Sequence, residues 1–482
     1  MDHLKDFRFG FQSQKVEWDN YSVEYTGRKL PDWLQGNLYR NGPGLYELGS
    51  EKMNHFFDGL AKIHSIQFTK DGIFSSGKFL KSKDYDKSTK ENKITYSEFA
   101  TVPDRNIFEK IFVSLLPNTQ FGDNASINFM KLKDHFVAIA DVPVPVSIQK
   151  GNIDTEGEFK YDDKLNLVIN SPHPQEDRKN KVVWNFGIEI DLLGTHYVVF
   201  KIPDGTRTRV PIAKIHTEHA AYMHSFITTE NYIILTEHPL VLDLLKMVTM
   251  GITGSSLIEA FDWKQTLGTK FIVVDKRTGK TVEKFSTDTF FTFHHMNAYE
   301  LDDSIILDLP VYNDMEIINQ FYLNRIHSEN GGNILTGELR RYKLDLKANS
   351  SNYKVVSDCG LEMPIINPNF YMKKYQYGYG VTNNKNKTND FNNQLVKVNM
   401  ETGEYKIWFE DGSYPTEPIF VPKPHSDLEE EGVLLSVVLD GKSESSYLLI
   451  LNAESFEEMG RAKLPYVVPF GFHGIFLNNM GD

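Results

Sequence analysis

The sequence predicts an all-β fold of the β-propeller type, and three observations lead to this prediction. Short apolar or alternating runs closed by turns recur along the chain, as is typical of strands; they include 136–140, 232–235, 271–274, 305–309, 394–398, 433–438 and 447–451. The same hairpin form occurs at 271–285 and 394–408, and more loosely at 448–464. Strands do not alternate regularly with helices, which argues against a parallel α/β sheet. Another large all-β fold remains the alternative.

The repeated hairpins have a common pattern. FIVVDKRTGKTVEKF and QLVKVNMETGEYKIW each read as a strand, an Asp or Asn, two residues, Thr-Gly and a second strand. Repeated antiparallel hairpins spread over a long chain favour propeller blades. Aromatic residues make up 13% of the sequence, which favours strands and an apolar cavity. No linker-like segment divides the chain, so we expect one domain over residues 1–482.

Two segments are expected to be helical, 106–116 (NIFEKIFVSLL) and 241–250 (VLDLLKMVTM). Both are strongly apolar, and each carries only two charges. Helices of this kind usually pack on a core. The alternative is an exposed apolar patch that dips into a membrane surface.

The composition excludes some classes of function and location. A net charge of -13 argues against nucleic acid as a partner, because phosphate binding needs a basic surface. The single cysteine, Cys359, allows no disulfide framework and favours a reducing compartment. The first ten residues carry charges where a signal peptide has an apolar run, and no stretch is apolar enough to span a bilayer. We therefore expect a cytoplasmic protein, with peripheral attachment to a membrane still open.

Four of the fifteen histidines lie in apolar or proline-containing surroundings. They are His173 in Ser-Pro-His-Pro, His224 in Tyr-Met-His-Ser-Phe, His294 in Phe-His-His-Met and His473 in Phe-Gly-Phe-His-Gly. A histidine in such a setting needs partners for its ring nitrogens, and a metal ion is one such partner. The sequence contains no HExxH or CxxC pair, so spacing alone does not select these four. A metal site remains one candidate beside ordinary structural histidines.

Longer motifs add a resemblance. They are GNLYRNGPGLYELGSEKMNHFFDGLAKIH (36–64), EFATVPDRNIF (98–108), GDNASIN (122–128), SYPTEPIFVPKPHSDLEEEGVLLSVV (413–438) and the closing PFGFHG. In these motifs and their order the chain resembles the carotenoid cleavage oxygenase family, and most closely its animal-type branch of β-carotene oxygenases and retinoid isomerohydrolase. The likeness runs nearly from end to end.

The resemblance implies a seven-bladed β-propeller with a helical cap and an iron(II) ion on its axis. The family's four iron ligands fall on His173, His224, His294 and His473. Its carboxylates, which accept from the other ring nitrogen of the ligands, fall on Glu362, Glu417 and Asp141. The family usually has Glu at the position of Asp141, whose side chain is one methylene shorter. Its contact with a histidine is therefore expected to need a shifted backbone or a bridging water.

The implied reaction is cleavage of a double bond in a carotenoid or apocarotenoid by dioxygen, with one oxygen atom in each carbonyl product. The sequence offers no general acid or base. Phe99 and Phe472 match aromatic positions of the family's substrate tunnel, although core packing explains them equally well. Ile127 matches a position beside the open side of the iron. The segments 106–116 and 241–250 match the family's membrane-facing patch.

Three alternatives stay open. A retinoid-ester isomerohydrolase shares this scaffold and uses no dioxygen, and the motifs do not separate it from a cleavage enzyme. A stilbene-type substrate is another option within the family. A propeller that only binds other molecules would hold no metal.

Overall fold

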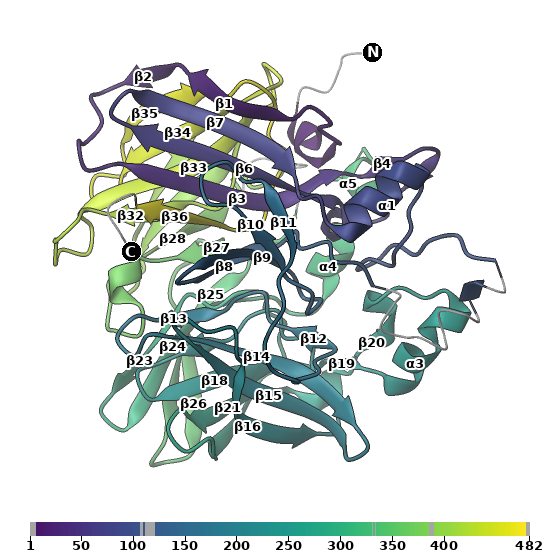
Figure 1. The fold of residues 1–482 in the computed structure, drawn as a ribbon. Helices are drawn as coiled ribbons and strands as arrows, with labels where there is room; N and C mark the ends of the chain where they lie inside the picture. The colour runs from purple at the N-terminus through teal and green to yellow at the C-terminus, as the bar shows by residue number, and fades with distance from the viewer. Residues whose placement is uncertain are drawn as a thin grey trace.

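The computed structural model describes residues 6–106, 109–110, 121–329, 331–332, 334–384 and 390–478. Seven antiparallel sheets of four to six strands surround a central axis as the blades of a propeller (Figure 1). The predicted fold class, a seven-bladed β-propeller, is thereby confirmed.

The blades follow one another along the chain. The first contains β1 (Trp18–Val23), β3 (Gly36–Leu45), β6 (Leu60–Thr69), β7 (Gly72–Phe79) and β36 (Gly474–Asn478). The second contains β8 (Asn128–Leu132), β9 (His135–Ile139), β10 (Val146–Ile148) and β11 (Thr155–Glu158). The third contains β12 (Ile169–Asn170), β13 (Gln175–Asp177), β14 (Val182–Asp191), β15 (Gly194–Pro203) and β16 (Val210–Thr217). The fourth contains β17 (Ile227–Thr228), β18 (Tyr232–Glu237), β21 (Thr269–Asp275) and β22 (Thr281–Thr287).

The last three blades complete the ring. The fifth contains β23 (Asn297–Leu301), β24 (Ser304–Val311), β25 (Glu338–Asp345) and β26 (Ser350–Val355). The sixth contains β27 (Glu362–Ile365), β28 (Tyr377–Thr382), β29 (Gln394–Asn399) and β30 (Tyr405–Phe409). The seventh contains β2 (Tyr25–Gly27), β31 (Ser413–Pro415), β32 (Ile419–Pro422), β33 (Gly432–Asp440), β34 (Ser445–Asn452) and β35 (Glu458–Lys463).

Both ends of the chain close the ring. Strand β36 pairs antiparallel with β3, from Arg40 opposite Gly474 to Gly36 opposite Asn478. Strand β2 pairs with β35 of the seventh blade. Apolar side chains fill the spaces between blades, for example where Leu38 and Ile66 of the first blade pack with Leu435 of the seventh. This closure brings the C-terminal motif with His473 beside the N-terminal motif with Arg40.

The repeated hairpin motif is explained by its turn. The Asp275 carboxylate accepts from the backbone N–H groups of Arg277 and Thr278, at 3.0 and 2.6 Å. Gly279 ends the turn at φ +71, in the left-handed region that glycine enters without strain, and a Cβ there would meet the Ile212 carbonyl at 2.0 Å. In the looser copy the corresponding position is Phe456, also left-handed at φ +64, whose ring is buried between blades.

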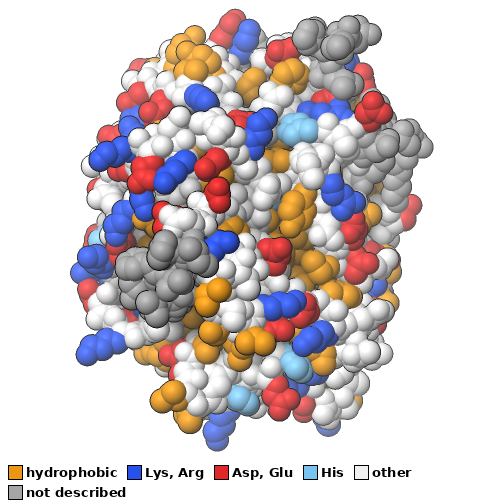
Figure 2. Space-filling view, turned by 90° about the vertical axis from the view of Figure 1, so that its right-hand side faces the viewer, with side chains coloured by type: hydrophobic (Ala, Val, Ile, Leu, Met, Phe, Trp, Pro, Cys, Tyr) orange, Lys and Arg blue, Asp and Glu red, His pale blue; other side chains and the backbone are white. Residues whose placement is uncertain are grey.

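The helices lie mainly on the right-hand side of the propeller in Figure 1, the side that Figure 2 faces. They are α1 (Lys83–Glu91), α3 (Leu244–Thr253), α4 (Glu316–Gln320) and α5 (Leu323–Ile326), and two short strand pairs accompany them: β4 (Glu47–Leu48) with β5 (Glu51–Lys52), and β19 (Leu240–Leu242) with β20 (Phe261–Trp263). Within the part of the chain that the structure describes, no helix is long and apolar enough to cross a membrane.

The expected helix at 241–250 is wrong at both of its ends. Residues 240–242 form strand β19, and α3 begins only after Asp243, whose carboxylate accepts from the N–H groups of Leu245 and Lys246. That N-cap fixes the start, and Gly254 at φ +74 ends the helix. Of the expected helix at 106–116, Glu109 and Lys110 are helical, and residues 107–108 and 111–116 lie outside the described residues.

Candidate metal centre

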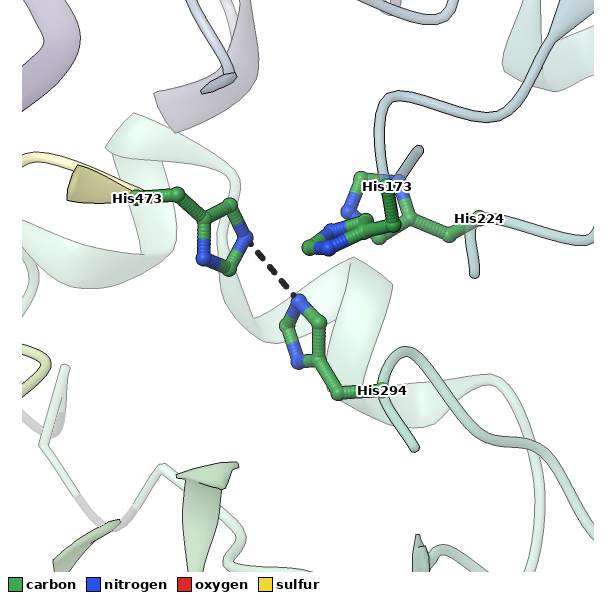
Figure 3. A group of neighbouring side chains, drawn as sticks. All are labelled: His173, His224, His294 and His473. Atoms are coloured by element: carbon green, nitrogen blue, oxygen red, sulfur yellow. Dashed lines mark hydrogen bonds between the residues drawn. The ribbon is translucent and has the colours of Figure 1, made fainter. Parts of the chain in front are cut away.

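Four histidines from four blades meet near the axis of the propeller (Figure 3). His173 lies between β12 and β13, and the other three, His224, His294 and His473, lie three residues or fewer before β17, β23 and β36. Each of these strands is at the end of its sheet. One nitrogen from each ring lies within 4.8 Å of the others, although the four residues span 300 positions of the chain. Blade geometry, not sequence spacing, brings them together.

The four nitrogens converge on one another. Nε2 of His294 and Nε2 of His473 face each other at 3.1 Å, as the dashed line in Figure 3 marks. Nε2 of His173 is buried and has no hydrogen-bond partner. Burial first, and then the neighbouring imidazoles, hold the pKa of His173 well below its ordinary value. Neutral imidazoles that point into a shared space are the form in which histidine binds metal ions.

Carboxylates contact the other nitrogen of three of the rings. Nδ1 of His473 lies 2.7 Å from Oε1 of Glu417, and Nδ1 of His294 lies 3.1 Å from Oε1 of Glu362. With these nitrogens protonated, the rings donate to the carboxylates and keep the Nε2 lone pairs free. Burial lowers the pKa of His473 to about 4, although Glu417 raises it.

The third carboxylate, Asp141, lies close to its histidine but does not bond it. Its Oδ1 lies 3.3 Å from Nδ1 of His224, too poorly aligned for a hydrogen bond of normal geometry. Its Oδ2 accepts from the hydroxyl of Tyr222 at 3.1 Å. Asp141 therefore lies close to His224 without a direct hydrogen bond to its ring, and Tyr222 holds the other oxygen of the carboxylate.

Each blade supplies one of these seven side chains. The first, third, fourth and fifth blades supply His473, His173, His224 and His294, and the second, sixth and seventh supply Asp141, Glu362 and Glu417. The neighbouring His295 faces a different way, because its two nitrogens contact the hydroxyls of Ser225 and Thr236, each at 2.7 Å. It sits in a loop before β23 rather than in a strand.

An apolar cavity opens beside the histidines. His224, His294 and His473 form part of its wall, and Ile127 and Phe472 are in that wall as well. Further aromatic side chains complete it, namely Phe56, Phe57, Phe293, Tyr312, Phe321, Phe391 and Phe470. Phe99 is not one of the lining residues; it packs against Phe57 with ring centroids 5.2 Å apart.

A polar basin of about 1060 Å³ lies next to the same centre. His173, His294 and His473 border it, and its wall includes charged side chains such as Glu176, Arg178 and Lys423. The histidines are thus bordered by a mainly apolar cavity and by a larger one whose wall includes charged side chains.

The four imidazoles fit a metal ion. Among the described residues they are the only group of three or more His, Cys, Asp or Glu side chains placed to hold one. Fold and site define a seven-bladed propeller with an axial four-histidine metal site. The family model "Retinal pigment epithelial membrane protein" matches residues 11–478. The chain belongs to this family, the RPE65/carotenoid oxygenase family, as its motifs predicted.

Individual relatives agree with this membership. The chain is 33% identical to beta,beta-carotene 15,15'-dioxygenase of Gallus gallus, over 94% of this chain and 95% of that protein. It is 32% identical to carotenoid isomerooxygenase of Galleria mellonella, over 93% and 92%. It shares its fold with cobalt-substituted apocarotenoid oxygenase of Synechocystis, with a TM-score of 0.84, 24% identity and coverage of 98% and 99%. These matches confirm the predicted enzyme class, the carotenoid-cleaving dioxygenases.

The structure adds residues that the sequence did not single out. Tyr222 lies two positions before His224 in the same motif, and Arg40 lies in the opening motif 36–64. The aromatic wall of the cavity comes from segments scattered between residues 56 and 472. Tyr222 and Arg40 both stand in motifs that the sequence had already marked, but the sequence does not show which side chains they contact.

Proposed function

We propose that the chain is an iron(II)-dependent oxygenase, a single domain over residues 1–482, that cleaves one double bond in the polyene chain of a carotenoid or apocarotenoid. His173, His224, His294 and His473 hold the iron, and Asp141, Glu362 and Glu417 orient three of them. The observation that carries this proposal is the convergence of four imidazoles, three of them buried, beside an aromatic-walled cavity. The kinship with enzymes named as carotenoid dioxygenases supports it.

The choice of iron(II) rests on the donors. Four neutral imidazoles suit a divalent transition metal, and an octahedral site would leave two positions for other ligands. Bound iron(II) would supply the redox chemistry that activates dioxygen. The carbon–carbon double bond breaks, and each of its two carbons receives one oxygen atom as a carbonyl group.

The side chains around the cavity position the substrate and exclude water. Phe472 lies directly before His473, and Ile127 lines the same wall, so both would contact a polyene beside the metal. The free space is about 70 Å³, so aromatic side chains must turn aside as the long chain enters. Phe99 supports Phe57 from behind and so shapes the wall indirectly. No side chain is needed as an acid or base, because no proton is transferred in the overall reaction.

We propose that the substrate arrives from a membrane surface. On helix α3 the side chains of Leu245 and Val248 are 74% and 71% exposed, and Leu192 at the tip of the β14–β15 hairpin is fully exposed. Figure 2 faces the side of α3 and shows hydrophobic side chains scattered among charged ones. Together with segment 106–116, Leu245 and Val248 would form a peripheral attachment site for a cytoplasmic enzyme. Its net charge of -13 argues against nucleic acid as a partner.

The test is incubation of iron-loaded protein with a panel of carotenoids and apocarotenals in an oxygen electrode. We expect oxygen uptake and two carbonyl products whose masses identify the bond that is cut. No uptake, together with hydrolysis of a retinyl ester, would instead identify an isomerohydrolase. No uptake and no bound metal would identify a propeller that only binds other molecules.

A further inference from the structure

Arg40 is a buried cation beside the proposed metal site. It lies on β3, is 3% exposed, and its Nη1 donates to Oε2 of Glu417 at 2.6 Å. Its Nη2 donates to the carbonyl oxygen of Phe472 at 3.0 Å, the residue before His473. A buried guanidinium cannot lose its proton, so it needs a carboxylate partner. Glu417 is the acidic group that forms its ion pair.

The other two carboxylates have neutral partners instead. Oδ2 of Asp141 accepts from the Tyr222 hydroxyl, and Oε2 of Glu362 accepts from the backbone N–H of Met363 at 2.9 Å. Neither forms an ion pair with Lys or Arg in the described part of the chain. Of the three, only Glu417 is therefore neutralised by a fixed positive charge.

The charges of this group lead to a specific balance. With the imidazoles neutral, three carboxylates and one guanidinium carry two negative charges in total. A divalent ion bound by the four histidines would make the whole buried group neutral. A trivalent ion would leave one uncompensated positive charge, which is costly in surroundings of low dielectric.

We propose that Arg40 is a positioning residue that sets the charge of the metal centre to match a divalent ion and so keeps the bound iron ferrous. This inference rests on the iron site proposed above. Without Arg40 the same three carboxylates would match a trivalent ion. Arg40 also fixes the backbone before His473, so its charge and its shape need to be tested separately.

The experiment is a redox titration of the iron-loaded protein with mediator dyes. Arg40→Met removes the charge and keeps most of the stem, whereas Arg40→Lys keeps the charge. Arg341→Met is the control, because Arg341 is a largely buried arginine, with its side chain 12% exposed, that forms its ion pair with Asp308 and not with one of the three carboxylates. We expect a more negative potential in Arg40→Met, with the ferric form favoured about tenfold or more. Arg40→Lys and Arg341→Met should keep the wild-type potential.

The same potential in Arg40→Met as in wild type would overturn the proposal. If Arg40→Met does not fold, the double variant Arg40→Met with Glu417→Gln removes both charges of the pair and should keep the wild-type potential. Glu417→Gln alone should then shift the potential to more positive values, and an unchanged potential in that variant would also overturn the inference. If the wild-type protein binds no iron, the iron site itself fails, which is a different result.

Discussion

Tyr222→Phe removes a single hydroxyl that holds Asp141 against His224. The hydroxyl donates to Oδ2 of Asp141 at 3.1 Å, and both side chains are buried, with Tyr222 1% and Asp141 8% exposed. Leaving a buried carboxylate oxygen without its donor costs about 1–3 kcal/mol. For a chain of this size that corresponds to a fall of roughly 1–3 °C in Tm. Because Asp141 then orients the His224 ring less firmly, we expect metal affinity to fall about tenfold.

The assay is a competition between the protein and a chelator for cobalt(II), read from the visible absorption of the bound ion. Tyr197→Phe is the control, since Tyr197 is also buried and donates to a carboxylate, Glu237, at 3.0 Å. It should lose comparable stability and keep its metal affinity. Equal affinity in the two variants would refute the view that Tyr222 acts through Asp141 on the metal site.

Three further predictions follow from other parts of the structure. Ile127 lies in the cavity wall beside the histidines, so Ile127→Thr should free space there and raise the affinity of the iron-loaded protein for nitric oxide, measured from the EPR signal of the ferrous complex, whereas Ile127→Leu should not. Leu245→Asp with Val248→Asp should weaken sedimentation with lipid vesicles without changing Tm, because both side chains are exposed; unchanged binding would remove α3 from the membrane site. Burial lowers the pKa of Lys62 from its ordinary value of 10.5 to about 8. Between these two pH values the folded protein has released the Lys62 proton, whereas the unfolded chain still holds it. Stability relative to Lys62→Met should therefore rise with pH across that range in chemical denaturation, and a flat difference would contradict the assignment.

Much of the fold was within reach of the sequence because propeller hairpins carry local signals. The turn of the Asp275–Gly279 motif needs a carboxylate acceptor and a glycine in the left-handed region, and both residues can be recognised in the sequence. The helix boundary at Asp243 could not be predicted because Val241 and Leu242 continue the apolar pattern of the helix. In the structure these two residues belong to strand β19, which pairs with β20. Pairing between distant segments is not encoded locally.

The four histidines illustrate the same limit. Their apolar or proline-containing surroundings made the four histidines candidates, and the resemblance to the carotenoid cleavage oxygenase family selected them. No rule of sequence spacing relates His173 to His473. Their proximity depends on the ring closing through β3 and β36. The role of Arg40 depends on the same closure, because its partners Glu417 and Phe472 lie more than 370 positions away in the chain. Side chains that act only through long-range contacts therefore required the structure.

We propose that all four histidines hold one iron ion, and anomalous diffraction at the iron absorption edge from crystals grown with iron(II) would locate it. We expect a single strong peak on the propeller axis, about 2.0–2.2 Å from Nε2 of His173, His224, His294 and His473. A peak elsewhere, or none in crystals whose protein cleaves a carotenoid, would contradict it.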